Sequence, residues 1–247
     1  MKVRVKFRKY GPVRFIGHLD VMRFFQKAIR RAGLDIAYTG GYSPHQIMTF
    51  AAPLGVGLES NGEYMDIELH SLGSCQEAVE RLNAVSVEGI EIVSVRVLPD
   101  KAANAMASVA AASYTVRFRE GRAPETDIAR LLPGFLARES IPYIKETKKG
   151  SRELDLKSGI YEMSWDGGAF SLLLDASSAG NIKPGQVVEA LLEQGGEKLQ
   201  ENALLITRED VYTRRELPGD GAGPGDRRCT RKDFISLGET GTLEINL

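Results

Sequence analysis

Residues 2–33 read KVRVKFRKYGPVRFIGHLDVMRFFQKAIRRAG, and this stretch decides the fold of the first part of the chain. Residues 2–8 alternate apolar and basic side chains, and this period of two predicts a half-buried strand. The basic residues of the strand share one face, which we expect to be exposed: Lys2, Arg4, Lys6 and Arg8. Gly11-Pro12 then predicts a turn.

An amphipathic helix is expected to start at His18 or Asp20 and to run to residue 32. Its apolar positions, among them Leu19, Met22 and Phe25, repeat at intervals of three and four, and Gly33 ends it. The basic residues fall largely on the opposite, solvent-facing side: Arg23, Lys27, Arg30 and Arg31.

The pattern continues through residue 99 with further strands and one more helix. Strands are expected at 34–38, 46–51, 62–70 and 90–98. Ser74 is the expected N-cap of a helix over 75–84, with Glu77 at the capping-box position. The order is roughly β-α-β-β-α-β, which is the split βαβ arrangement of ferredoxin-like folds.

The same order of elements then restarts after an alanine-rich segment at 100–112, which we take as a linker and which could instead be a short helix. We expect strands at 114–119, 141–146, 151–175 and 203–212, and helices at 125–138 and 184–194. Asp166-Gly167-Gly168 predicts a hairpin turn, and Pro184 suits the first turn of a helix. The sequence therefore predicts an α+β fold of two tandem ferredoxin-like (βαββαβ) units at 1–99 and 113–212, followed by a flexible tail at 213–247.

Composition places the chain among ordinary soluble globular proteins. Its 247 residues are 43% hydrophobic and 26% charged, which excludes wholesale disorder and a disulfide scaffold. We find no apolar stretch of membrane-spanning length and no secretory signal, so we expect a cytoplasmic protein without membrane contact. Cys75 and Cys229 lie far apart, so we expect no zinc motif and no iron–sulfur cluster held by thiolates alone.

Positive charge is concentrated at the N-terminus. Residues 1–50 hold ten Lys or Arg and two acidic residues, a balance of +8, whereas the rest holds 22 basic and 31 acidic residues, a balance of −9. A basic block on a neutral protein indicates an anionic partner, with nucleic acid the first choice. A charged solvent face that docks on the acidic remainder of the same molecule is the alternative.

The first candidate site is the segment from Arg14 to Arg23, joined to Arg30-Arg31 further along the predicted helix. Gly17 and His18 stand where the strand gives way to the helix, and helix N-termini with a nearby arginine bind phosphate or carboxylate. In the structural alternative, Asp20 caps the helix and His18 packs.

The second candidate site is the loop Gly40-Gly41-Tyr42-Ser43-Pro44-His45. Tyr42 could stack on a base, Ser43 offers a hydroxyl, and His45 could form an acid–base pair with His18. We expect the two imidazoles at one end of the first sheet. Otherwise Pro44 is a turn former and His45 begins the next strand.

Two further segments are weaker candidates. The glycine-rich run 55–62 lacks a Walker lysine, so a hairpin-like connection is the favoured interpretation. The charged run 145–157 could extend a nucleic-acid surface, although such runs are usually solvated turns. We expect no metal site and no bound cofactor.

The N-terminal motifs resemble the radical-SAM-linked domain family of unknown function. They are Gly11-Pro-x-Arg14-Phe-x-Gly-His18-Leu-Asp20, Ala28-Ile-Arg30-Arg31-Ala32-Gly33, Gly41-Tyr42-Ser43-Pro44-His45 and the run from Pro53 to Tyr64. In that family the domain often follows a B12-binding radical SAM enzyme and otherwise occurs alone. The resemblance implies a radical SAM protein as partner. It transfers these positions only as binding residues, because the family has no settled activity.

The sequence therefore favours an RNA-binding module that presents its RNA to a radical SAM enzyme acting in trans, rather than an enzyme. Phosphates would be bound by Arg14, Arg23, Arg30 and Arg31, Tyr42 would stack on a base, and His18 and His45 would orient the substrate. Ser43 is a further candidate nucleic-acid-binding residue. The first alternative is a metal-independent endoribonuclease with His18 and His45 as acid and base. The tandem architecture resembles that of CRISPR repeat-processing ribonucleases, whose C-terminal glycine-rich loop is not evident here. The second alternative is a protein–protein adaptor.

Overall fold

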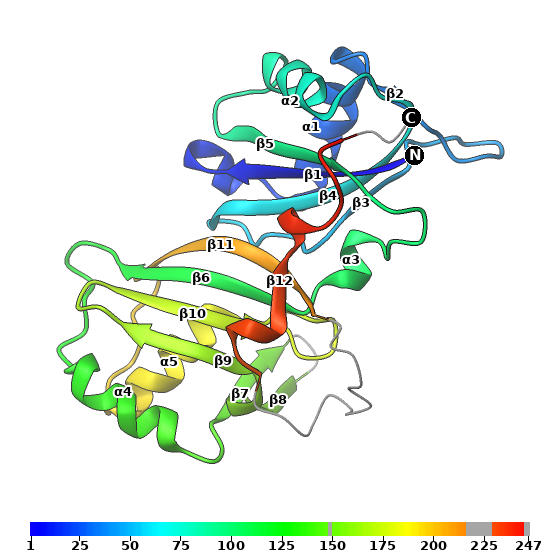
Figure 1. Cartoon of the computed structure of the whole chain (residues 1–247). Coiled ribbons are helices and arrows are strands. Elements are labelled where there is room, and N and C mark those ends of the chain that lie inside the picture. Colours follow the sequence, from blue (N-terminus) through cyan, green and yellow to red (C-terminus); the bar gives the residue numbers. More distant parts are fainter. Residues whose placement is uncertain (148–149, 216–228, 245–247) are drawn as a thin grey trace. The chain divides into compact units, whose positions relative to one another are not determined.

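The computed structural model describes residues 1–147, 150–215 and 229–244 (Figure 1). Over these residues the chain is a mixed α+β protein with a large, mostly antiparallel sheet and five α-helices. It forms two compact units: unit 1 comprises 1–109, 208–214 and 235–247, and unit 2 comprises 110–207 and 215–234. Unit 1 is thus assembled from three separate stretches of the chain, which the sequence analysis did not foresee.

Unit 1 is a sheet with helices over one face. Its strands follow the order β5-β1-β4-β11. Strands β2 and β3 also pair with β4, on the edge of β4 that faces away from β1. The elements are β1 (Lys2–Lys9), the 3-10 helix η1 (Gly11–Phe15), α1 (His18–Arg31), β2 (Asp35–Ile36), β3 (Met48–Phe50), β4 (Glu59–Ser71), α2 (Cys75–Ala84), β5 (Ile90–Val97), α3 (Ala105–Ser108) and β11 (Leu204–Arg214). Strand β11 is shared: residues 208–214 belong to unit 1 and its first residues, up to 207, to unit 2.

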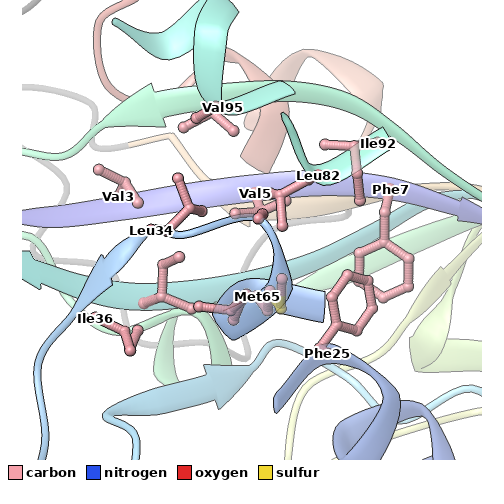
Figure 2. Close-up of a cluster of buried hydrophobic side chains, with 14 of the residues drawn as sticks. Val3, Val5, Phe7, Phe25, Leu34, Ile36, Met65, Leu82, Ile92 and Val95 are labelled. Atoms are coloured by element: carbon pink, nitrogen blue, oxygen red, sulfur yellow. The ribbon is translucent and has the colours of Figure 1, made fainter. Parts of the chain in front are cut away.

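The core of unit 1 lies between the sheet and the two long helices (Figure 2). Val3, Val5 and Phe7 alternate along β1 and are fully buried, as the period of two predicts. The Phe7 ring meets that of Phe25 from α1 edge-on, with centroids 4.7 Å apart. Leu82 anchors α2 on the same face. Each such side chain contributes roughly 1.5–3 kcal/mol of burial free energy.

The opposite face of β1 is not the exposed basic surface that the sequence predicted. Arg4 is buried and forms an ion pair with Asp66, because a late segment of the chain covers this face. That segment, residues 235–244, is called the C-terminal strap below. It includes most of β12 (Phe234–Ser236) and all of η4 (Leu237–Glu239), and Thr242 forms a bridge with Val97 of β5.

The strap also changes the prediction of a flexible tail over 213–247. Residues 216–228 and 245–247 lie outside the described residues, but residues 229–244 contain β12, η4 and the 3-10 helix η3 (Arg231–Asp233). Leu237 is fully buried, and Ser236 donates to Asp210 at 2.7 Å. Buried apolar area and paired polar groups hold this part of the chain in place.

Unit 2 repeats a sheet covered by helices. Its strand order is β11-β6-β10-β9, and β7 and β8 form a separate two-stranded sheet. The elements are β6 (Ala111–Phe118), α4 (Ile128–Ala137), β7 (Pro142–Thr147), β8 (Gly150–Asp155), η2 (Lys157–Gly159), β9 (Ile160–Trp165), β10 (Ala169–Asp175) and α5 (Pro184–Gln194). As expected, Pro184 opens α5, and Gly167 takes a positive φ of 98° in the β9–β10 turn.

Candidate nucleic-acid interface

A hairpin over residues 37–47 interrupts the edge strand of unit 1. β2 and β3 both pair antiparallel with β4, at Ile36↔Leu69 and Met48↔Ile67, so they continue one edge strand. Both ends of the excursion are fastened to Glu68: its carbonyl accepts from the Ala37 N–H at 2.8 Å, and its own N–H donates to the Ile47 carbonyl at 3.2 Å. The sequence pattern predicts two separate strands at 34–38 and 46–51 and does not indicate that they continue one edge strand.

Hydrogen bonds across the hairpin stiffen it. The Thr39 N–H donates to the His45 carbonyl at 2.9 Å, and the His45 N–H donates back to Thr39 Oγ1 at 3.1 Å. The imidazole Nδ1 of His45 lies 3.0 Å from the same hydroxyl oxygen. Residues 40–45 are exposed, and the Tyr42 side chain is fully exposed at the tip. Figure 1 shows this light-blue loop projecting beyond the sheet edge.

The outer face of α1 carries a row of cations. Its exposed basic residues, called the α1 basic face below, are Arg23, Lys27, Arg30 and Arg31. Their spacing of three and four places them on one side of the helix. Arg23 pairs with Asp20 at 3.2 Å, but both side chains are at least 60% exposed, so the pair is weak. The other three have no acidic partner among the described residues.

The hairpin and the α1 basic face are held side by side. The buried Gln46 reaches across from the hairpin and donates from Nε2 to the Gln26 carbonyl at 3.2 Å, one residue before Lys27. At the end of α1, Arg81 from α2 donates to the carbonyls of Ala32 and Gly33 at 2.7 and 2.6 Å. The first contact ties the base of the hairpin to the middle of α1, and the other two fasten α2 to the end of the same helix.

His18 and Arg14 lie elsewhere. His18 is the first residue of α1, and its ring meets Phe50 edge-on at 5.0 Å, in a small pocket that Lys9 and Glu63 also line. Arg14, in η1, pairs with Glu59 at 3.0 Å. His18 therefore packs, as the structural alternative predicts. Asp20 does not cap the helix as that alternative also predicts: Gly17 occupies the N-cap, and Asp20 forms an ion pair with Arg23.

The predicted pairing of His18 with His45 is wrong. The His18 pocket includes Lys9 at the end of β1. His45 comes shortly before Met48, the first residue of β3, which pairs with Ile67 of β4, and Ile67 also pairs with Val3 near the start of β1. Strand β1 advances roughly 3.3 Å per residue, so the two sites lie at opposite ends of the sheet. The error arose because the loop containing His45 comes before the edge strand resumes as β3.

The charged residues of the His18 pocket already have partners within unit 1. Lys9 is 2% exposed and donates to the carbonyls of Arg14 and Ile16 at 3.3 and 3.0 Å. Burial lowers the pKa of Lys9, and the nearby Glu63 charge opposes that shift. Glu63 in turn accepts from Arg208 Nε at 2.8 Å. No local sequence pattern indicates this network, because Glu63 and Arg208 are 145 residues apart.

The two weaker segments behave as connections. The glycine-rich run packs on η1, where the Gly57 N–H donates to the Arg14 carbonyl at 2.8 Å. The charged run forms the β7–β8 hairpin, of which residues 148 and 149 lie outside the described part. Across the described ranges there is no cluster of three or more His, Cys, Asp or Glu residues able to hold a metal ion. No helix there is long and apolar enough to cross a membrane.

These features define an α+β protein with a basic helix face beside an exposed aromatic hairpin. The chain belongs to the family described as "Uncharacterized protein conserved in bacteria (DUF2344)", whose model matches residues 2–184. This match places the chain in a family of unknown function, as expected, and its description names no radical SAM enzyme.

Other comparisons add no functional information. A search of curated proteins gave no match. Among solved structures, a chain of the "Crystal Structure of a Cbf5-Nop10-Gar1 Complex" is similar at 11% identity with a TM-score of 0.44. The match covers 85% of this chain and 48% of that one, so this chain spans about half the length of that relative.

Proposed function

We propose that this protein is an RNA-binding module that grips RNA phosphates through the α1 basic face. The observation that carries the proposal is the row Arg23, Lys27, Arg30 and Arg31, where three of four cations have no acidic partner in the described chain. Cations neutralised by a neighbouring carboxylate would gain little from a phosphate, whereas these three would release counterions and water to bind it. Arg30 has one further contact, from Nε to the Gln26 carbonyl at 3.2 Å. Arginine also offers two parallel donors to phosphate oxygens.

The proposed architecture supports this use of α1. We propose that both units follow the ferredoxin-like plan, because the orders β5-β1-β4-(β3/β2) and β11-β6-β10-β9 each match the 4-1-3-2 arrangement of a split βαβ. In unit 1 the C-terminal strap covers the sheet face that lies opposite the helices. Binding through the helix side therefore fits unit 1 better than binding through the open sheet face.

We further propose that the bound RNA is presented to a radical SAM enzyme acting in trans. The support is the resemblance of the motifs at 11–20, 28–33, 41–45 and 53–64 to domains that often follow such enzymes. On this proposal the present chain supplies recognition and the partner supplies the reaction.

The salt dependence of binding tests the phosphate contacts. The triple variant Arg23→Gln/Arg30→Gln/Arg31→Gln should bind RNA much more weakly. Its plot of log affinity against log salt should be flatter by roughly two units, at about 0.7 per lost contact on a single strand. The matched control is Arg122→Gln/Arg130→Gln/Arg138→Gln, which removes the same charge from exposed positions of unit 2. Equal losses in the two triples would contradict a local site on α1.

Co-purification tests the partner. The chain should retain RNA when purified at low salt, and the α1 triple variant should lose it. With RNase added, wild type and the α1 triple variant should both capture a radical SAM protein from the same cell if that protein contacts this chain directly. If the contact is made only through RNA, neither form should capture it. If wild type binds a protein but no RNA at low salt, the adaptor alternative replaces the proposal.

A further inference from the structure

We infer that the hairpin over residues 37–47 makes the site selective for unpaired nucleotides, with Tyr42 stacking on a base while the α1 basic face holds the adjoining phosphates. This inference rests on the proposed function and names its substrate class: single-stranded or looped RNA. The observation behind the inference is the fully exposed Tyr42 ring on a hairpin whose base is tied to α1, the helix that carries the basic face, by the hydrogen bond from Gln46 to the Gln26 carbonyl.

The tip leaves both faces of the Tyr42 ring open. The tyrosine is fully exposed and has no partner among the described residues. Neither Gly40 nor Gly41 has another atom within 4 Å of where a Cβ would stand, so the surroundings are empty. An aromatic ring left wholly in water forgoes the burial that normally stabilises it, which favours a role in recognition.

The base of the hairpin is fixed, although its tip is open. The two backbone contacts to Glu68 and the reciprocal contacts of Thr39 and His45 hold residues 37–39 and 45–47 as a short ladder. A ring carried on a rigid base loses little freedom when it binds. Tyr38, also on this hairpin and 46% exposed, offers a second aromatic surface closer to the sheet.

The geometry of RNA explains the expected preference. Bases inside an A-form duplex are stacked on their neighbours, and the deep, narrow major groove excludes side chains. Unpaired bases expose their faces to aromatic rings, and stacking tolerates any base identity. The hairpin should therefore favour single strands and loops with weak sequence preference.

Fluorescence anisotropy with two labelled RNAs tests the inference. One probe is a single strand of about 12 nucleotides, a length in the range that single-strand sites cover, and the other is a blunt duplex of the same length. Wild type should favour the single strand. Tyr42→Ala should weaken single-strand binding by about 5- to 150-fold, the range for loss of one stacked base, and should leave duplex binding and the salt slope unchanged.

Two variants serve as matched controls. Tyr42→Phe keeps the ring and should bind like wild type. Phe15→Ala removes another exposed aromatic side chain, which lies at the end of η1, before the first residue of α1. This variant should bind both probes like wild type. An unchanged affinity of Tyr42→Ala for the single strand, or an equal loss on both probes, would overturn the inference.

The outcomes also separate the two proposals. If the α1 triple variant loses binding and Tyr42→Ala does not, the proposed function stands and the selectivity is refuted. Such a tip would then be open to a protein partner. If wild type binds neither probe at low salt, both proposals fail.

Discussion

Arg4 and Asp66 face each other across β1 and β4 as a two-pronged ion pair that is almost fully buried. Arg4 Nε lies 2.7 Å from Asp66 Oδ1, Nη2 lies 2.9 Å from Oδ2, and the side chains are 3% and 4% exposed. The remaining donor, Nη1, reaches Thr240 Oγ1 at 2.8 Å. A residue near the beginning of the chain thus depends on one near its end.

Removing one member of this pair should be costly. Asp66→Ala leaves a buried guanidinium without its counter-charge, so we expect the free energy of unfolding to fall by about 3–5 kcal/mol in urea titrations. The double variant Arg4→Met/Asp66→Leu removes both charges and should recover most of that loss. A double variant no more stable than Asp66→Ala would contradict this account of the pair.

The strap should contribute through a smaller, separable contact. Thr240→Val keeps the shape of the side chain but removes the oxygen that accepts from Arg4 and donates to the Leu237 carbonyl. We expect a loss of about 1–3 kcal/mol. Thr242→Val removes a hydroxyl that accepts nothing from Arg4 and donates to the exposed Glu244 carbonyl, so it serves as the control. Equal unfolding midpoints for the two variants would argue against the Arg4 contact.

Stiffness of the hairpin should depend on one hydroxyl. Thr39→Val deletes the oxygen that accepts from the His45 N–H, so amide hydrogen exchange in residues 39–46 should accelerate while the rest of unit 1 stays protected. On the proposed function, affinity for single-stranded RNA should also fall. Thr39→Ser retains the oxygen and should resemble wild type, and faster exchange throughout unit 1 would show that the effect is not local.

Tyr143 gives unit 2 a pH-dependent contribution to stability. Burial first, then its hydrogen bond to Glu189 and the charges of Glu189 and Glu193, raise the pKa of Tyr143 to about 12. The unfolded phenol ionises near pH 10, so the stabilisation is fully present below about pH 10 and disappears as the pH rises towards 12. The difference in phenolate absorbance between wild type and Tyr143→Phe should show a step near pH 12; a step near pH 10 would refute the shift.

Separation of His18 and His45 predicts that they do not cooperate in RNA cleavage. Purified protein incubated with total RNA without added metal should give no specific fragments, and neither should the His18→Ala/His45→Ala variant. Specific fragments that appear with wild type and vanish in the variant would restore the ribonuclease alternative.

Local patterns were sufficient for much of unit 1. The alternation at 2–8 predicts β1, and the apolar spacing predicts α1 with its basic outer face. Ser74 caps α2 as expected and accepts from the Glu77 N–H at 3.0 Å. The Glu77 carboxylate, however, pairs with Arg81 at 3.3 Å.

Contacts between distant parts of the chain were beyond the sequence patterns. The strap covers Arg4. The alternation at 2–8 predicts two faces of β1, but it cannot show that residues near position 240 cover one of them. Likewise, the pattern at 34–51 predicts strands. It does not show that these strands continue one edge strand, nor that a hairpin projects between them. The residues of the candidate site could therefore be named from the sequence. Their separation, with His18 at one end of the sheet and His45 at the other, depends on the strand register, which the sequence does not show.

Unit 1 takes its last pieces from 208–214 and 235–244, so its assembly follows the order in which the ribosome releases the chain. When residue 109 has just been added to the chain, Glu63 has no Arg208 and Arg4 has no Thr240, while the whole of 110–207 is still to be made. The inserted unit can therefore collapse before the unit that surrounds it is closed. A nascent chain that has left the ribosome as far as residue 234 contains all of the second unit but not the strap. Its second unit should resist proteases while its first unit is still cut.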